Sequence, residues 1–364
     1  MPADSSRALL DRWPVFDGHN DLPFRMRVLG HPSDASVDVV SRAHTDLDRL
    51  HAGGVGAQWW SVWVPGDIPE PDAVVQVLEQ IERVHRFVAR HPERTALCRS
   101  ADDVERARAR GLLASLIGAE GGHSIGGSLD VLRALARLGM RYMTLTHNQS
   151  TAWADSATDE PRSGGLSDFG REVVAEMERL GVLVDLSHVA VTTMHAALDV
   201  ATRPVLFSHS SARAVCDHVR NVPDEVLLRL EGNGGVCMVT FVAGFVSKDV
   251  DVWERQELPD RLARAGIDPE DADAVTAYER SLGDAVPVAT VEQVADHVEH
   301  VREVCGLPGV GLGGDYDGCR VLARGLEDVS CYPALLDVLR ERRWSDDELG
   351  ALTWRNALRV LRGG

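Results

Sequence analysis

The sequence predicts an α/β protein, a (β/α)8 TIM barrel. Two observations lead to this fold class: short apolar or β-branched runs alternate with amphipathic stretches, and nearly every run ends in a histidine or a carboxylate. Strands that alternate with helices pair in parallel, and eight of them favour a closed barrel. Because the C-terminal strand ends of such a barrel meet at one mouth, these polar residues would share one pocket.

The predicted strands are eight short runs spread over the chain. They are Val15–His19, Val55–Val64, Leu112–Ala119, Tyr142–Thr146, Val182–Ser187, Pro204–Ser208, Gly235–Phe241 and Val310–Gly314. Helical patterns lie between most of them. The clearest is Phe169–Leu180, in which apolar residues recur at helical spacing until Gly181 stops the helix.

The chain is predicted to form one domain, residues 1–364. Of its 364 residues 44% are hydrophobic, enough for a sizeable core, and no Pro- or Gly-rich linker divides them. About 70 residues separate the seventh and eighth runs, more than one crossover needs, so an inserted loop or helical segment is predicted at about 246–290. Such an insert is either a lid or specificity element or a passive surface excursion.

Composition limits the partners and the location that we expect. The chain has 38 Lys and Arg against 56 Asp and Glu, a net charge of −18, and an acidic surface repels nucleic acid. No segment approaches the ~20 apolar residues of a membrane span. The first twelve residues lack the apolar core of a signal peptide. We therefore expect a cytoplasmic protein without membrane contact, with its six cysteines as free thiols.

His19 and Asp21 end the first run. Residues two apart on a strand share a face, so both side chains can point into the barrel mouth. A neutral imidazole and a carboxylate suit zinc or a similar divalent ion. Taken alone, the pair is weak evidence for a metal site and is better explained as two satisfied polar groups at a strand end.

Three further candidate ligands end later runs. Glu120 follows an apolar strand, where a buried carboxylate is costly unless a cation or metal pairs with it, and its two oxygens can bridge two ions. It could instead belong to a helix start or pair with an arginine. His188 and His209 close consecutive runs, so they can reach one ion. Each alone would be read as a core histidine, but their paired placement favours ligands.

Three residues are candidates for contact with a substrate. Asp315 closes the last run and could exchange a proton with metal-activated water, with Asp317 as a second candidate. His147 could polarise a carbonyl, or it could anchor a loop. Arg220 could pair bidentately with a substrate carboxylate, or it could be a surface arginine near a helix start.

Seven ordered stretches resemble the membrane dipeptidase (renal dipeptidase) family. The resemblance extends from Phe16 to the end of the chain, where the segment Trp354–Leu361 also resembles the family. The seven stretches are Phe16–Asp21, Gly118–Gly122, Leu145–Asn148, Asp185–His188, Ser208–Arg213, Arg220–Asp224 and Gly313–Gly318.

The resemblance implies a barrel of the amidohydrolase type with two zinc ions per chain. By position, His19 and Asp21 would hold one zinc, His188 and His209 would hold the other, and Glu120 would bridge both. The implied reaction is hydrolysis of dipeptides, L-Xaa-L-Xaa and also L-Xaa-D-Xaa, by a hydroxide that bridges the metals. Members of the family form a disulfide-linked dimer. For this chain we expect at most a non-covalent homodimer, without the disulfide.

The resemblance also implies a role for each remaining residue. His147 would polarise the scissile carbonyl, Arg220 would bind the terminal carboxylate, and Asp315 would serve the hydroxide as proton shuttle, with Glu120 also in the catalytic set. The alternative enzyme is an amidohydrolase-superfamily hydrolase that acts on a cyclic amide or lactone. A metal-bearing binding protein is disfavoured because no ligand or shuttle is missing. The preferred side chains of the substrate are not fixed by the sequence.

Overall fold

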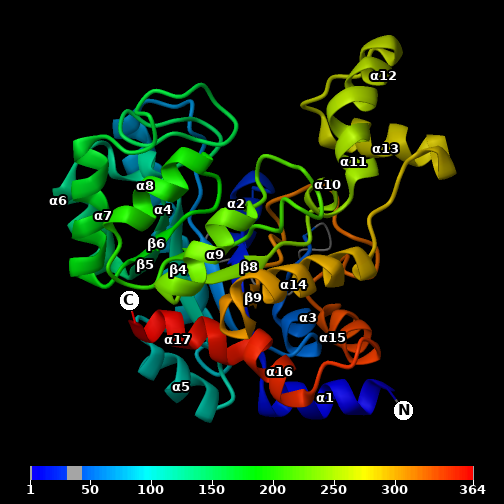
Figure 1. Ribbon diagram of the computed structural model, residues 1–364, viewed down its shortest axis with the longest axis horizontal. Helices are drawn as coiled ribbons and strands as arrows, with labels where there is room; N and C mark the ends of the chain where they lie inside the picture. The colour runs from blue at the N-terminus through cyan, green and yellow to red at the C-terminus, as the bar shows by residue number, and fades with distance from the viewer. Residues whose placement is uncertain (1, 31–42, 364) are drawn as a thin grey trace.

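Eight parallel strands close into a barrel in the computed structural model, which describes residues 2–30 and 43–363 (Figure 1). The strand order is β2-β1-β9-β8-β7-β6-β5-β4, and β2 also pairs with β4, which closes the barrel. A ninth strand, β3, extends the sheet beside β4. The strands are β1 (Val15–Asn20), β2 (Val55–Ser61), β3 (Thr95–Leu97), β4 (Leu113–Glu120), β5 (Met140–Thr144), β6 (Leu183–Asp185), β7 (Leu206–Phe207), β8 (Val236–Val239) and β9 (Val310–Leu312).

The predicted (β/α)8 fold is confirmed, and each predicted run contains or overlaps one barrel strand. The helices are α1 (Pro2–Arg12), α2 (Leu22–Val28), α3 (Leu47–Ala52), α4 (Glu70–Arg90), α5 (Ala101–Ala109), α6 (Leu129–Leu138), α7 (Asp168–Leu180), α8 (Val191–Val200), α9 (Asp224–Asn233), α10 (Ala243–Val246), α11 (Lys248–Val252), α12 (Leu258–Ala265), α13 (Ala272–Leu282), α14 (Val291–Cys305), α15 (Tyr332–Glu341), α16 (Asp346–Gly350) and α17 (Asn356–Gly363). Short 3-10 turns are η2 (Gly122–Ile125), η4 (Gly283–Ala285) and η5 (Leu307–Gly309), and π-turns are η3 (Trp253–Glu257) and η6 (Ala351–Arg355).

Helix α7 shows how local sequence sets these elements. The Ser167 side chain caps its first turn by accepting a hydrogen bond from the Gly170 backbone N–H. Val173, with the apolar residues that follow it at helical spacing, is buried toward the barrel. Gly181 ends the helix in the left-handed conformation at φ 68°, which glycine adopts without a steric penalty. The helix predicted at Phe169–Leu180 is therefore confirmed.

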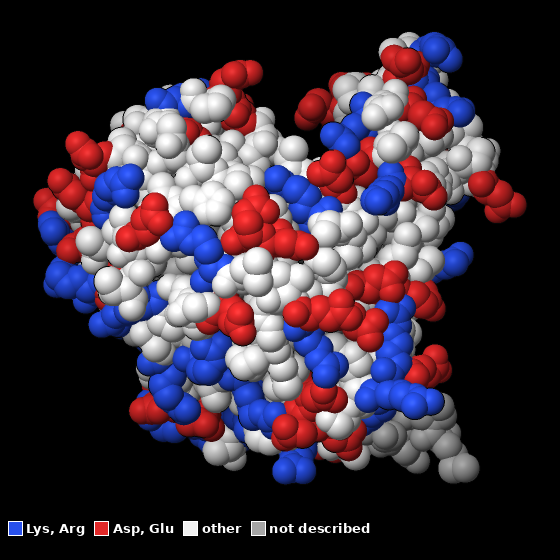
Figure 2. Space-filling view, in the orientation of Figure 1, with Lys and Arg blue, Asp and Glu red and all other residues white. Residues whose placement is uncertain are grey.

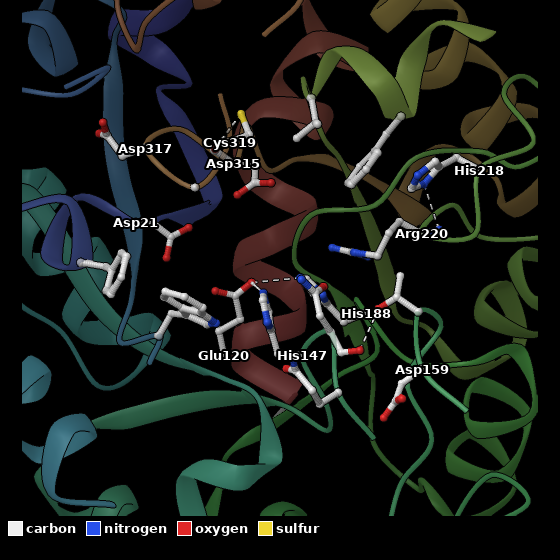
Figure 3. A pocket seen from close by; sticks show the side chains of 18 residues that line it. Asp21, Glu120, His147, Asp159, His188, His218, Arg220, Asp315, Asp317 and Cys319 are labelled. Carbon is white, nitrogen blue, oxygen red and sulfur yellow. Dashed lines mark hydrogen bonds and ion pairs between the residues drawn. The ribbon is translucent and has the colours of Figure 1, made fainter. Parts of the chain in front are cut away.

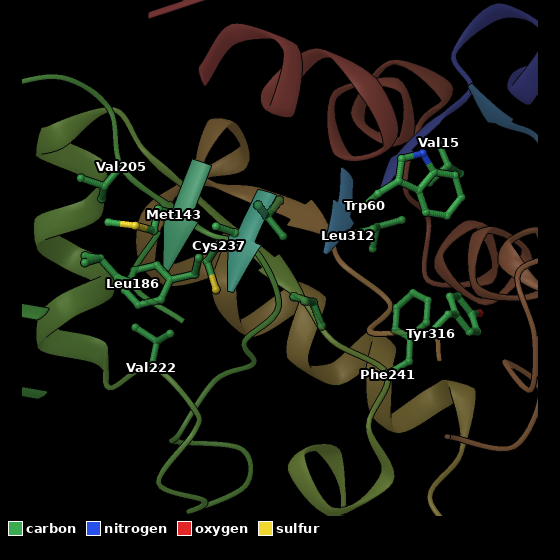
Figure 4. Close-up of a cluster of buried hydrophobic side chains, with 14 of the residues drawn as sticks. Val15, Trp60, Met143, Leu186, Val205, Val222, Cys237, Phe241, Leu312 and Tyr316 are labelled. Carbon is green, nitrogen blue, oxygen red and sulfur yellow. The ribbon is translucent and has the colours of Figure 1, made fainter. Parts of the chain in front are cut away.

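Aromatic rings fill the barrel interior beneath the mouth. Phe16 stacks on Trp59 with ring centroids 4.7 Å apart, and Trp59 lies 5.6 Å from Tyr142. A larger apolar layer packs the outer faces of the strands against the helices, and Figure 4 shows part of it, including Leu186 and Phe241. Because the interior is packed, the strand ends above it are held as a rigid floor for the site.

The segment predicted as an insert, about 246–290, is mostly helical. It contains an arm, which we define as residues 248–285, from α11 to η4. The arm has a small hydrophobic cluster of its own, formed by Trp253, Leu258, Leu262 and Val275. In Figure 1 it projects from the barrel at the upper right.

The charged residues are spread over the surface. Figure 2 shows acidic and basic side chains intermixed on one face, with a notch between the arm and the body of the barrel. Among the described residues, no helix combines the length and the apolar character that crossing a membrane requires.

Candidate metal centre

The structure brings the predicted metal ligands together at the C-terminal ends of the strands. His19 and Asp21 lie at the end of β1, and Glu120 is the last residue of β4. His188 and His209 follow β6 and β7. All five side chains are buried. The barrel therefore converts positions far apart in the sequence into one cluster, as the fold predicts.

Glu120 lies at the centre of this cluster. Its Oε2 atom is 3.3 Å from His19 Nε2, which in turn is 3.1 Å from Asp21 Oδ2. Its Oε1 atom is 3.0 Å from His188 Nε2 and 3.4 Å from His209 Nε2. One carboxylate thus faces two sets of ligands with its two oxygens, an arrangement that can bridge two cations.

The geometry does not separate the two sets completely. The ligand atoms of His19, Glu120 and His209 lie within 4.8 Å of one another, and so do those of Glu120, His147 and His188. His147, predicted to contact the substrate, has its Nε2 3.8 Å from Glu120 Oε1. His147 therefore lies at the edge of the cluster and is close enough to act on a group bound there.

The residues present fit a cation. The Nε2 atoms of His188 and His209 face each other at 2.9 Å, and Asp21 Oδ1 is buried without a hydrogen-bond partner. Burial lowers the pKa of both histidines well below its usual range, which keeps the imidazoles neutral as metal ligation requires. Burial also raises the pKa of the Glu120 carboxyl. The pKa of His19 is raised instead, against the effect of burial, by Tyr142 and by the neighbouring Glu120 and Asp21 carboxylates. Imidazoles and buried carboxylates of this kind are the donors that a divalent metal needs.

Hydrogen bonds behind the ligands set the orientation of two imidazoles. His19 Nδ1 is 2.7 Å from the Tyr142 hydroxyl, and His209 Nδ1 is 2.7 Å from Ser208 Oγ. Ser208 Oγ donates to Asp185 at 2.5 Å. Both rings therefore direct Nε2 toward the cluster. Sequence reasoning assigned no role to these supporting residues, although Asp185 and Ser208 stand beside His188 and His209 in the family-like stretches.

Gly118, two residues before Glu120 on β4, lies against a packed side chain, because a Cβ there would lie 2.1 Å from the Tyr142 ring. Asp317, the second shuttle candidate, lines the cavity but is partly engaged by a loop: its Oδ1 accepts from the His44 backbone N–H at 2.7 Å, and its own N–H donates to His44 Nδ1.

Asp315 is better placed for chemistry. Its carboxylate lies within 4.8 Å of His19 and Asp21, and burial raises its pKa well above the usual range. The residue has a φ of 60°, a conformation that turns the chain at the mouth. A Cβ on Gly318 would lie 2.4 Å from Asp315 Oδ1, so glycine is needed to let the loop pass over the carboxylate.

The cluster opens into a cavity of about 770 Å³. Figure 3 shows Glu120, His147, Arg220 and Asp315 pointing into it. The apolar part of the lining includes Phe24 and Trp63, whose ring centroids are 4.3 Å apart, and also Val242 and Phe245. The polar part also includes Asn148, Gln149, Thr158, Asp159, His218, Asp317 and Cys319. A cavity of this size accommodates a small molecule.

Arg220 is buried, with 3% of its surface exposed, and its Nη1 has no hydrogen-bond partner. Burial lowers its pKa to about 10, which leaves the guanidinium charged at neutral pH. The alternative explanation, a surface arginine near a helix start, is therefore wrong. A buried, unsatisfied guanidinium is suited to a carboxylate or phosphate ligand.

The family model described as membrane dipeptidase, peptidase family M19, matches residues 3–363. Dipeptidase 3 of Mus musculus is 40% identical over 366 residues, which cover 99% of this chain and 66% of that protein. Dipeptidase 3 of Homo sapiens is also 40% identical, over 364 residues that cover 98% of this chain and 66% of that protein. The chain thus spans about two thirds of the length of these relatives.

Solved structures show the same fold. The probable dipeptidase PvdM from Pseudomonas aeruginosa has a TM-score of 0.85 at 22% identity and covers 100% of this chain and 98% of that chain. A metallo peptidase from Rhodobacter sphaeroides, liganded with a phosphinate mimic of the dipeptide L-Ala-D-Ala, has a TM-score of 0.81 at 23% identity and covers 96% and 99%.

Proposed function

Because the chain belongs to the membrane dipeptidase family, peptidase family M19, we propose that it is a metal-dependent hydrolase of dipeptides. One observation supports this most directly. Glu120 turns one oxygen to His19 and the other to His188 and His209, while the Arg220 guanidinium lies unsatisfied in the same cavity. Two metal ions bridged by Glu120 would act on a carbonyl, and the Arg220 guanidinium would bind a carboxylate. The two together fit a substrate in which the scissile carbonyl lies close to a carboxylate.

The proposed metal content is two zinc ions. His19 and Asp21 would hold one ion and His188 and His209 the other, with Glu120 between them. Nitrogen and carboxylate donors suit zinc. When bound, the ions would lower the pKa of a water molecule at the centre and polarise the scissile carbonyl.

The chain's own groups would bind the dipeptide and move the protons. Arg220 would donate two N–H bonds to the C-terminal carboxylate. His147 is neutral because burial lowers its pKa, and its ring N–H would donate to the carbonyl oxygen as negative charge develops there. The Asp315 carboxylate would take a proton from the attacking water and give it to the nitrogen of the leaving amine.

The proposed substrates include dipeptides with a D-residue at the C-terminal position. Arg220 would bind the C-terminal carboxylate and make no contact with the side chain of that residue. Both an L-residue and a D-residue can therefore be bound at that position. The Rhodobacter sphaeroides relative, solved with a mimic of L-Ala-D-Ala, is consistent with this substrate class. A cyclic amide or lactone without a carboxylate would leave Arg220 buried and unsatisfied.

Hydrolysis of free and C-terminally amidated dipeptides by wild type and Arg220→Met tests the proposal. Met keeps much of the volume and removes the charged fork. A charged, bidentate contact is worth ~1.5–3 kcal/mol, so the variant should lose about 10–150-fold in kcat/KM on the free dipeptide and little on the amide. If wild type cleaves no dipeptide when loaded with zinc, the proposed function is wrong. If it cleaves both forms equally, only the role of Arg220 is wrong.

A further inference from the structure

The arm is fixed to the barrel close to the substrate cavity. Arg320, in the loop after β9, forms an ion pair with Glu279 of α13 and lies 3.7 Å from Glu254 in η3. The chain enters the arm through α10, whose Phe245 lines the cavity. The arm therefore has a fixed root beside the cavity.

Arg220 forms no ion pair with a carboxylate among residues 2–30 and 43–363, and its Nη1 has no hydrogen-bond partner, so Asp315 and Glu120 act on its charge only from a distance. The Phe245 ring lies beneath it instead, with the guanidinium carbon 5.3 Å from the ring centroid. That distance is within the range of a cation–π contact, which leaves the guanidinium N–H groups free for a ligand. An aromatic face can thus orient this side chain without occupying its donors.

His218 supports Phe245 and the Arg220 backbone together. Its ring stacks on Phe245 with centroids 4.4 Å apart, and its Nδ1 accepts from the Arg220 backbone N–H at 3.2 Å. Because Nδ1 accepts, the ring proton of the neutral imidazole is on Nε2. Nε2 lies 3.8 Å from Asp251 Oδ1, on α11 of the arm. Asp251 is itself buried and held by Arg255 through a two-pronged ion pair.

Asn221 ties the same loop to the root of the arm. Its amide nitrogen donates to the Phe245 carbonyl at 2.7 Å and to the Cys216 carbonyl at 2.9 Å. Its amide oxygen accepts from the Ser211 backbone N–H at 3.2 Å, two residues after His209. The loop that carries Arg220 is therefore joined to the metal cluster on one side and to the arm on the other.

We propose that Phe245 and His218 form an aromatic bracket that aims Arg220 at the substrate's C-terminal carboxylate, and that the arm holds this bracket through Asp251. The inference rests on the proposed function, because it assigns Arg220 to that carboxylate. It makes the inserted arm a specificity element and Phe245, His218 and Asp251 positioning residues. The substrate class that the bracket selects is a dipeptide with a free C-terminal carboxylate, of either hand.

The first test replaces the ring. Phe245→Leu removes the aromatic face and keeps an apolar side chain, while Phe24→Leu is the matched control, an aromatic residue of the same cavity lining whose ring contacts Trp63. For zinc-loaded Phe245→Leu, KM for a free dipeptide should rise and the ratio of kcat/KM on free to amidated dipeptide should fall by about 2- to 30-fold. Phe24→Leu should change both substrates alike, and Phe245→Tyr should retain the wild-type ratio.

The second test acts from the arm. Asp251→Asn should lower the same ratio, with zinc content and melting temperature recorded as checks on the centre and the fold. Asp260→Asn is its control, because Asp260 lies on α12 and is 77% exposed. An unchanged ratio in Phe245→Leu overturns the bracket, and an unchanged ratio in Asp251→Asn overturns its support by the arm. If Arg220→Met shifts the ratio while Phe245→Leu does not, the proposed function stands and the bracket alone is wrong.

Discussion

Replacing Asp185 with asparagine should weaken metal binding, although Asp185 is not among the proposed ligands. Asp185 is fully buried at the end of β6. Its Oδ2 accepts from Ser208 Oγ at 2.5 Å and from Thr144 Oγ1 at 2.8 Å, and its Oδ1 accepts from two backbone N–H groups. The Ser208 hydroxyl hydrogen points at Asp185, so Oγ can only accept from His209 Nδ1. His209 therefore carries its proton on Nδ1 and offers the Nε2 lone pair to a metal.

Asparagine at position 185 reverses the direction of the hydrogen bonds that link this side chain, Ser208 Oγ and His209 Nδ1. The backbone bonds to Oδ1 can persist, but Nδ2 would take the place of Oδ2 and donate to Ser208 Oγ. The hydroxyl hydrogen is then free to point at His209 Nδ1, which favours the tautomer with its proton on Nε2. Loss of such an outer hydrogen bond typically costs 10–100-fold in metal affinity, or ~1.4–2.7 kcal/mol.

Competition with a chromophoric chelator measures this effect directly. Zinc affinity of Asp185→Asn should fall by about 10–100-fold relative to wild type. Thr144→Val is the matched control, because it removes a donor to the same carboxylate oxygen and leaves the contact between Ser208 and His209 in place. Wild-type affinity in Asp185→Asn, or an equal loss in Thr144→Val, would refute the tautomer argument.

Three further predictions concern the centre and its scaffold. Glu120→Gln should lose bound zinc in elemental analysis, whereas Asp315→Asn should keep it while turnover falls by roughly 10²–10⁴-fold. Gly118→Ala should lower both zinc affinity and melting temperature, because its Cβ would lie 2.1 Å from the ring of the tyrosine that holds His19. Hydrogen bonds from two arginines lower the pKa of Glu176 from 4.5 to about 2. The Glu176 carboxylate therefore stabilises the fold fully above pH 4.5, and this stabilisation is lost as the pH falls toward 2. Urea titrations should show that the difference in unfolding free energy between wild type and Glu176→Gln becomes smaller between pH 4.5 and pH 2.

The barrel could be predicted because most of its strands are short, largely apolar segments that are buried on both faces. The exception is β3, which has three residues, pairs only with β4 and stays outside the closed ring. The boundaries were less predictable. The run Val182–Ser187 contains a strand of only three residues, β6, because the chain leaves extended geometry as it turns toward the centre: His188 has a φ of 70°.

The candidate site was predictable to the extent that strand ends converge. His19, Glu120 and His209 lie together because the topology requires it, and their residue types point to a metal site only once the strand ends are taken together. Tyr142 and Phe245 were not predictable, because their contacts depend on barrel closure and on where a loop meets the arm. The three tryptophans of the second run show the same limit. Trp59 fills the barrel interior, Trp60 packs against Phe87, and Trp63 lines the cavity.

The chemistry of the centre and the stability of the chain oppose each other at the barrel mouth. Burial raises the pKa of the Glu120 and Asp315 carboxyls, so placing both near Asp21 costs free energy when no cation is present. Cations that bind only the folded chain would offset this cost. The free energy of unfolding should therefore rise as metal is bound. Arg220 offsets this cost only in part: its charge acts against the burial that raises the pKa of Asp315, but its guanidinium forms no ion pair with these acids among the described residues and packs against the Phe245 ring instead. Because no ion pair occupies the Arg220 Nη1 group in the described part of the chain, that group can bind a carboxylate ligand while Glu120 and Asp21 face the candidate metal site.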